Sequence, residues 1–297
     1  MLRPMRARLI VNPEAGRGVG RRLGREIERC LAALGLDFTT TWSASVGDVA
    51  VQAEAACRAG SDPVIVAGGD GTVCEGVNGV MRAGAGTRLG IIPVGTGNDL
   101  IKAAGLPRHW RAACERAVAG SPRRVDVGRC NEHYFVNGIG AGFDAEVARA
   151  ARGIRHLRGN LVYGAALARM LVRGVRTPRV TIEDEHGRIE DSVTLVAVAN
   201  GPYYGGAFHI APGATIDDGW LDVVIAAAVG RLGVLRFTPR VLAGTHLSLP
   251  IVRHHRTRRV TITCDEGLCV HADGEILYDD ARRLEIEILP QALSLLV

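Results

Sequence analysis

The sequence predicts an α/β domain with a parallel sheet, followed by an antiparallel β-sandwich domain. In the first third of the chain, short apolar runs alternate with helical spacings, and glycine-rich loops follow several of the runs. Beyond about residue 126, short alternating segments separated by turn residues replace this pattern, as is typical of a sandwich. The 297 residues include 38 glycines without a fixed period, which indicates many tight turns and close backbone approaches.

The elements of the first domain follow from apolar spacing and from helix stop signals. Leu23, Ile27, Leu31 and Leu34 have helical spacing, and Gly35 ends that helix. Strand, glycine loop and helix then recur, and this order predicts helical crossovers over a parallel sheet. The expected elements are the strand 8–11, the helices 21–34 and 48–59, the strand 63–67, the helix 73–83 and the strand 89–93.

The second domain is expected to consist mainly of strands, interrupted by one helical stretch at 144–175. We place the domain boundary after residue 127, with an α/β domain at 1–127 and a β-sandwich domain at 128–297. The sequence leaves open whether the last residues return to the first domain. The expected strands are 134–139, 179–183, 192–199, 221–226, 259–264, 269–271 and 284–289.

Composition narrows the class of protein. The 36 basic and 31 acidic residues give a net charge of +5, and Lys102 is the only lysine. This arginine-rich balance is typical of a GC-rich genome, and the alternative is attraction to nucleotides or acidic lipid headgroups. The seven cysteines form no C-x-x-C pair and are expected to be reduced core residues. No apolar run approaches transmembrane length, so we expect a cytoplasmic protein.

Three glycine-rich loops are the candidate ligand site: 12–18, 68–72 and 93–99. Glycine allows a positive φ and lets backbone N–H groups approach phosphate oxygens at a helix start. None of the loops matches a P-loop or a dinucleotide-binding motif. One such loop is more often a simple turn, but ligands of open α/β sheets bind at the carboxyl ends of the strands, where all three loops are expected.

The loops belong to an ordered series of motifs: NPEAGRG, GGDGTVCEGVNG, IIPVGTGNDLIKAAGLP, DDGWLDV and DGE. This series resembles the diacylglycerol-kinase catalytic family, above all the bacterial soluble lipid kinases, with sphingosine kinases as relatives. The resemblance covers nearly the whole chain. GGDGT alone also occurs in NAD kinases and phosphofructokinases, whereas its combination with P-x-G-T-x-N-D and a late DGE is specific.

The resemblance implies a kinase that uses ATP and Mg²⁺, with its active site in the cleft between the two domains. It implies Glu275 as the proton acceptor, with Asp273 and Asp70 as further catalytic carboxylates. A magnesium site would use Thr215, Asp218 and Trp220, the first and last through main-chain carbonyls. The implied nucleotide-binding residues are Asn12, Pro13, Glu14, Ala15, Gly16, Thr41, Gly69, Asp70, Gly71, Thr72, Glu75, Thr96, Asn98 and Asp99.

Each carboxylate also has a structural interpretation. Asp99 is equally suited to cap a helix, Asp126 to begin a strand, and the segment 217–219 to form a simple turn. Spacing does not decide whether Asp273 or Glu275 is the base. Two positions differ from the usual family pattern, Ala15 in place of serine and Cys74 in place of asparagine, and neither removes a charged group.

The expected partners are ATP and a lipid substrate at the membrane surface, reached by transient peripheral association. Arginines at 149–176 surround an apolar stretch, which suits either a membrane-facing surface or a solvated helix packed on the sandwich. The basic run 253–259 lacks interleaved aromatics, so we expect a solvated loop and no nucleic-acid binding. The acceptor lipid is not indicated, and a homodimer is left open. Two alternatives are a kinase for a soluble acceptor such as NAD, and a regulator that binds nucleotide or lipid without catalysis.

Overall fold

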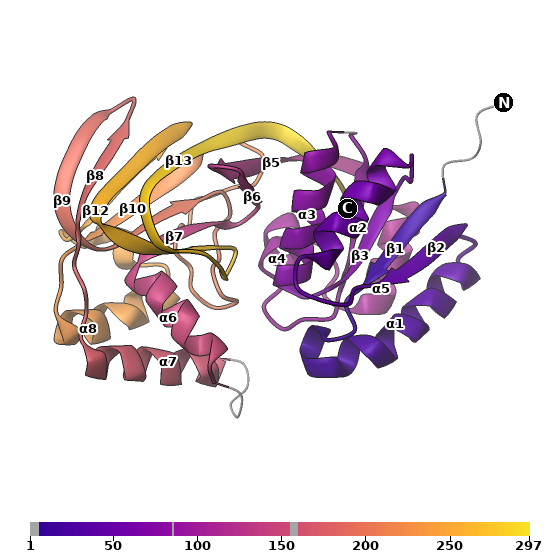
Figure 1. Cartoon of the computed structure of the whole chain (residues 1–297), viewed down its shortest axis with the longest axis horizontal. Coiled ribbons are helices and arrows are strands. Elements are labelled where there is room, and N and C mark those ends of the chain that lie inside the picture. The colour runs from indigo at the N-terminus through magenta and orange to yellow at the C-terminus, as the bar shows by residue number, and fades with distance from the viewer. Residues whose placement is uncertain (1–5, 85, 155–159) are drawn as a thin grey trace. The chain divides into compact units, whose positions relative to one another are not determined.

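The chain forms two compact units in the computed structural model, which describes residues 6–84, 86–154 and 160–297 (Figure 1). Unit 1 extends to Val127 and also includes Pro290–Val297. Unit 2 comprises Gly128–Leu289. The last residues of the chain therefore pack with the first unit, and Asp126 anchors them there: its buried carboxylate accepts a hydrogen bond from the Gln291 amide at 2.7 Å.

The sheet of unit 1 has the order β13-β4-β3-β1-β2, and the pairs that involve β1 to β4 run parallel. Its central strand β3 is fully buried because both faces of the sheet are covered by helices. Only the end of β13 takes part, through Ser294 and Leu295 beside β4. The strands are β1 (Ala7–Val11), β2 (Phe38–Trp42), β3 (Val64–Gly68), β4 (Arg88–Pro93) and β13 (Glu275–Leu296).

Two layers of helices cover this sheet because alternate side chains of each strand point to opposite faces. Leu9 and Val11 of β1 pack in one cluster with residues of α1 and α5. Val66 of β3 faces α3, which packs against α2. The helices are α1 (Ala15–Ala33), α2 (Asp48–Arg58), α3 (Asp70–Ala83), α4 (Asp99–Ala104) and α5 (Trp110–Ala119).

The sequence-based prediction missed β2 and α5 in this unit. All five residues of β2 are only partly buried, since it is the last strand of the sheet, and so it lacks the apolar run that identified its neighbours. The predicted helix at 21–34 lies within α1 apart from its last residue, and α1 itself begins earlier, at Ala15. Gly16, Arg17 and Gly18 have positive φ angles, so this first part is a loop and the regular helix begins after it.

Unit 2 is built from antiparallel strand pairs around an apolar core of valine, isoleucine and leucine side chains. The predicted strands 259–264 and 269–271 are one long strand with irregular register. β5 enters this unit from unit 1 and pairs with β6. The strands are β5 (Pro122–Cys130), β6 (His133–Phe135), β7 (Gly138–Gly142), β8 (Arg179–Asp184), β9 (Gly187–Ala199), β10 (Leu221–Ala227), β11 (Val252–Thr257), β12 (Arg259–Ala272) and the first part of β13.

The predicted helical stretch 144–175 is two helices, α6 (Phe143–Arg152) and α7 (Asn160–Arg173). Arg155 and Arg158 of the predicted basic surface lie outside the described residues. A third helix, α8 (Arg231–Leu242), and the short η1 (His246–Ser248) were not predicted. Val234 of α8 packs with Phe143 of α6 and Met170 of α7. Within the described ranges, no helix is long and apolar enough to cross a membrane.

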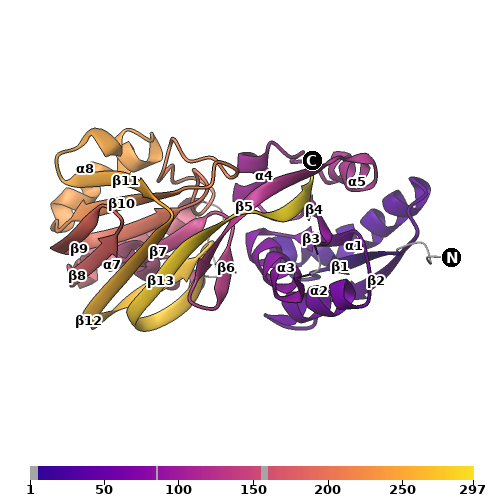
Figure 2. The same cartoon turned by 90° about the horizontal axis from the view of Figure 1, so that it is seen from above.

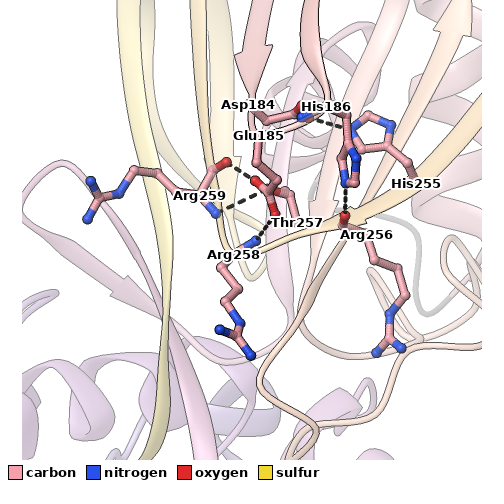
Figure 3. Close-up of polar contacts among 8 residues, drawn as sticks. All are labelled: Asp184, Glu185, His186, His255, Arg256, Thr257, Arg258 and Arg259. Atoms are coloured by element: carbon pink, nitrogen blue, oxygen red, sulfur yellow. Dashed lines mark hydrogen bonds and ion pairs between the residues drawn. The ribbon is translucent and has the colours of Figure 1, made fainter.

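The basic run 253–259 was wrongly predicted to be a loop. It forms β11 and the start of β12, and β11 pairs with β10 from Leu221 to Ala226. The tip of the β8–β9 hairpin contacts this run (Figure 3). His255 Nε2 lies 2.5 Å from Asp184 Oδ2, and Glu185 accepts hydrogen bonds from Thr257 and from the Arg258 amide. These contacts fix the backbone from which Arg256 and Arg258 project.

Candidate active site

The three glycine-rich loops lie at one edge of the unit 1 sheet, because β1, β3 and β4 are parallel and each loop follows the carboxyl end of one of them. Asn12 in the first loop donates a hydrogen bond to the Thr72 hydroxyl at 2.9 Å. The amide of Val94 donates to the carbonyl of Gly68 at 2.8 Å and so joins the second loop to the third. The loops thus form one bonded group.

Glycine is required where the loops touch. A Cβ atom on Gly95 would lie 2.6 Å from the Cα atom of Gly69, closer than any real side chain approaches backbone. A Cβ on Gly16 would lie 2.7 Å from the carbonyl oxygen of Val94, and Gly16 also has a positive φ. The loops therefore pack backbone against backbone, with no room for side chains at these contacts.

Helix α3 begins inside this group of loops and provides an anion-binding end. Its N-cap residue is Gly69, which has no side chain to bond the first amides of the helix. The first N–H groups of any helix lack an intrahelical acceptor, and the helix dipole adds positive potential there. Gly71 and Thr72 belong to this first turn. Backbone amides at a glycine-bounded helix start suit the oxygens of a phosphate group.

Asn98 and Thr41, two of the predicted nucleotide-binding residues, each have a buried side-chain oxygen with no hydrogen-bond partner among the described residues. These atoms are Asn98 Oδ1 and Thr41 Oγ1. Asn98 is held in the third loop by its own Nδ2 group, which donates to the Gly95 carbonyl at 3.1 Å. Thr41 lies on β2, paired in register with Ile10 of β1. Buried polar atoms usually have partners, so these two are available to a ligand.

Asp70 links the second loop to the third. Its two carboxylate oxygens accept hydrogen bonds from the amides of Asn98 (2.8 Å) and Asp99 (2.7 Å). Burial and the nearby Asp99 carboxylate raise the pKa of Asp70 above its usual value, and the two amides act in the opposite direction. Asp99 is itself buried and forms an ion pair with Lys102 at 3.1 Å. Asp70 therefore caps α4 as well as placing negative charge at the loops.

The other predicted nucleotide-binding residues differ in burial and in their hydrogen-bond partners. The carboxylate of Glu75 accepts hydrogen bonds from the amides of Gly47 (2.9 Å) and Val49 (3.0 Å), so it caps α2 and its oxygens are engaged away from the glycine loops. Glu14 and Thr96 are exposed, and Glu14 pairs with Arg21. In the first loop Ala15 is buried and the Pro13 carbonyl accepts a bond from the Arg21 amide.

Asp273 and Glu275, two residues apart, have different surroundings in unit 2. The Asp273 carboxylate accepts three backbone hydrogen bonds, from Val136, Asn137 and Gly138, at 2.8 to 2.9 Å. Glu275 begins β13 and pairs with Arg152 of α6, and its side chain remains 56% exposed. Asp273 is thus held by backbone amides, whereas the Glu275 carboxylate is exposed and paired with a single arginine.

An apolar cavity of about 160 Å³ lies within unit 2 and reaches the turn that precedes Glu275. Its polar lining residues are Thr194, Thr238 and His246 together with His271 and Asp144, whose Nε2 and Oδ2 atoms lie 3.3 Å apart. The Gly274 amide donates to His271 Nδ1 at 3.3 Å. The apolar lining residues include Phe143, Val147, Leu195, Tyr204, Phe208, Ile210, Val224, Val234, Phe237, Val241, Leu249 and Val252.

The sequence analysis did not identify Asp144 or His271 as site residues. Asp144 lies in the first turn of α6, directly after the glycine-rich strand β7. That position was the one signal in the sequence that could have identified it as a site residue. A side chain at Gly140 would lie 2.0 Å from Asp144 Oδ2 and 2.3 Å from His271 Nε2, so glycine lets this pair sit against the strand. The Asp144 Oδ1 atom is buried without a hydrogen-bond partner in the described structure.

The predicted metal turn does not fit a magnesium ion as it is folded. Asp218 Oδ1 accepts a hydrogen bond from the Trp220 amide at 3.1 Å, and Oδ2 pairs with Arg256. The Arg258 guanidinium lies 4.7 Å from the centre of the Trp220 ring. A cation at Thr215 to Trp220 would have to displace Arg256. Elsewhere in the described ranges, no group of three or more His, Cys, Asp or Glu residues is arranged to hold a metal.

Comparison with known proteins gives matches along almost the entire chain. Residues 6–130 match the family model described as the diacylglycerol kinase catalytic domain. Residues 137–297 match the YegS C-terminal NAD kinase beta sandwich-like domain. Diacylglycerol kinase of Mycobacterium tuberculosis is 32% identical over 293 residues, which cover 97% of this chain and 93% of the relative.

Two further relatives agree with these matches. Diacylglycerol kinase of Bacillus subtilis is 29% identical over 272 residues, covering 91% of this chain and 89% of the relative. A crystal structure of a diacylglycerol kinase from Bacillus anthracis superimposes with a TM-score of 0.76 at 26% identity. That superposition covers 98% of this chain and 96% of the other.

We predict that Asp218 and Arg256 stabilise unit 2 as a pair, independently of magnesium. A double-mutant cycle of Asp218→Asn and Arg256→Gln should give a coupling free energy of about 0.5 to 1 kcal/mol, because both side chains are partly solvated. Urea unfolding with EDTA and with excess magnesium measures it. A coupling near zero, together with a magnesium-dependent loss of stability in Asp218→Asn alone, would restore the metal assignment.

Proposed function

Because the chain belongs to the family of diacylglycerol kinases and YegS-like lipid kinases, we propose that it transfers the γ-phosphoryl group of ATP to the hydroxyl group of diacylglycerol or a similar lipid alcohol. One observation supports this proposal above the others. The same chain holds a glycine-bounded helix start suited to phosphates and an apolar cavity that reaches the turn before an exposed carboxylate, Glu275.

In this proposal, unit 1 binds the nucleotide. The first-turn amides of α3 bind phosphate oxygens, and Gly16, Gly69 and Gly95 allow the loops to lie close around them. Asn98 and Thr41 supply their unpaired oxygens to donors of the nucleotide or of its water shell. Asp70 keeps the second and third loops in one arrangement through its two backbone hydrogen bonds.

Unit 2 would bind the acceptor. Alkyl chains gain about 0.8 kcal/mol for each CH₂ group that they remove from water, so the apolar cavity favours a lipid over a soluble alcohol. Asp144 Oδ1 and His271 provide a polar position in that lining for the glycerol part of the lipid. The bond from Gly274 to His271 connects this position with the turn that carries Glu275.

The reaction then needs one proton acceptor. Glu275 accepts the proton of the lipid hydroxyl as the hydroxyl oxygen attacks the γ-phosphorus atom. The bond from the γ-phosphorus to the bridging oxygen breaks, and ADP leaves with that oxygen. Arg152 holds the Glu275 carboxylate in position.

We propose that magnesium enters with the nucleotide, as MgATP, because magnesium is commonly held by substrate phosphates with one or two carboxylates. When bound, it would neutralise charge on the phosphates. Asp70, in the second glycine loop, is the carboxylate that we propose to hold this magnesium ion. Both of its oxygens also accept backbone hydrogen bonds.

The function is tested by incubating the protein with labelled MgATP and a panel of acceptors. We expect label in phosphatidic acid when diacylglycerol is supplied, and none in NADP when NAD replaces the lipid. Label in NADP would favour a kinase for a soluble acceptor. Tight ATP binding without transfer to any lipid in the panel would favour a regulator without catalysis.

Glu275→Gln should lower turnover by at least about tenfold while nucleotide affinity stays near that of the wild type, because a general base typically contributes about 10²–10⁴-fold. Asp273→Asn is the matched comparison. It should mainly lower the free energy of unfolding, since Asp273 accepts three backbone bonds. Turnover and urea unfolding are measured for both. The assignment is wrong if Glu275→Gln keeps full turnover.

Asp70→Asn should abolish most of the activity and lower the free energy of unfolding by about 1–3 kcal/mol, because one buried amide at α4 would lose its acceptor. Asp62→Asn is the control for the stability effect alone. Asp62 accepts a bond from the Arg88 amide at 2.9 Å and precedes β3, at the strand end opposite the glycine loops. It should lose stability but keep turnover per folded molecule. Equal turnover in the two variants would contradict the role of Asp70.

A further inference from the structure

Helix α8 presents apolar side chains that the packing of unit 2 does not cover. Leu232, Leu235 and Leu242 are 82%, 52% and 46% exposed. Large apolar side chains that gather on one exposed helix indicate a surface that binds another protein or a membrane. Arg236 and Arg240 are exposed on the same helix, which carries no acidic residue.

The helix has two distinct apolar sides. Val234, Phe237 and Val241 line the cavity of unit 2, and Val241 packs beside Val224 of β10. At about 3.6 residues per turn, Leu232 and Leu235 lie on the side away from these residues. Figure 2 shows α8 beside β10 and β11. One side of α8 therefore lines the cavity, and its opposite side carries the exposed leucines.

The charge around α8 selects the kind of partner. Of the seven arginines in the segment 223–264, Arg253, Arg256 and Arg259 pair with Asp191, Asp218 and Glu287, whereas α8 itself carries Arg231, Arg236 and Arg240 and no aspartate or glutamate. Leucines bordered by arginines match a lipid bilayer that carries anionic headgroups, because leucines enter the acyl boundary while guanidinium groups meet phosphates. A helix of this kind lies in the plane of the interface.

We propose that α8 docks on an anionic membrane, with Leu232 and Leu235 inserted and Arg236 and Arg240 at the headgroups. The proposal rests on the lipid kinase function, since the opposite side of the helix lines the cavity assigned to the lipid. A lipid acceptor would then pass from the bilayer into the cavity beside α8. This places the docking surface on α8, whereas the sequence analysis had left 149–176 open as either a membrane-facing surface or a solvated helix.

The test is co-sedimentation of the full chain with phosphatidylcholine vesicles, with and without phosphatidylglycerol. The double variant Leu232→Gln and Leu235→Gln should bind anionic vesicles at least about tenfold more weakly, because two inserted side chains are lost. The matched control is Val46→Gln with Val51→Gln, two valines of unit 1 that are 94% and 63% exposed. It should bind like the wild type.

The arginines are tested in the same assay. The double variant Arg236→Gln and Arg240→Gln should lose about fivefold in binding per arginine and most of its response to phosphatidylglycerol and salt. Arg25→Gln with Arg29→Gln, on exposed positions of α1, is the control. Unchanged binding of the leucine variant would overturn the proposal. So would the loss of a dimer in that variant, seen by sedimentation, because α8 would then join two copies of the chain.

A water-soluble, short-chain diacylglycerol separates this proposal from the function itself. All four α8 substitutions lie outside the cavity lining, so turnover on that monomeric acceptor should stay near that of the wild type. Failure of the wild type to phosphorylate any diacylglycerol would reject the proposed function, while the vesicle result would still decide whether α8 binds membranes.

Discussion

The close contact between Gly69 and Gly95 is the constraint on which the proposed nucleotide site depends. Any side chain at Gly95 would collide with the backbone of Gly69. With the two loops in contact, Asp70 can reach the amides of Asn98 and Asp99 and hold the third loop against the second. The start of α3 then keeps its first amides directed to a ligand, because Gly69 has no side chain that could cap them.

In unit 2, hydrogen bonds decide what two neighbouring acidic residues can do. The Asp273 carboxylate accepts hydrogen bonds from three backbone amides and so fixes the turn. Glu275 follows that turn with an exposed side chain and an arginine partner. The cavity is connected with the same turn through His271 and Gly274. One short motif thus combines a structural anchor, a contact with the cavity and a candidate base.

The apolar surfaces of unit 2 support the proposal that a lipid substrate passes from a membrane into the protein. The cavity lining is mostly apolar, and two of its polar members, Asp144 and His271, pair with each other. Helix α8 has apolar residues both on its cavity side and on its exposed side. A soluble substrate would need neither surface, whereas a lipid that leaves a bilayer would pass from one to the other.

The sequence by itself determined the local elements and the motifs. The predicted strands 8–11, 63–67 and 89–93 lie in β1, β3 and β4, because buried strands flanked by glycine loops carry an apolar signal. The edge strand β2 and the basic strand β11 carry no such signal and were missed. The glycine loops were predicted to be a ligand site because glycine, unlike most residues, marks positions where the backbone needs a positive φ or a close approach.

Only the tertiary structure decided which polar groups are engaged. Glu75 meets the Gly47 amide 28 positions away, and Asp273 meets the Val136 amide 137 positions away. Arg256 reaches across 38 positions to pair with Asp218, the side chain that the sequence had suggested as a metal ligand. No local pattern reports such partners, because hydrogen bonds and ion pairs depend on where distant segments fold, and the role of a carboxylate depends on those partners.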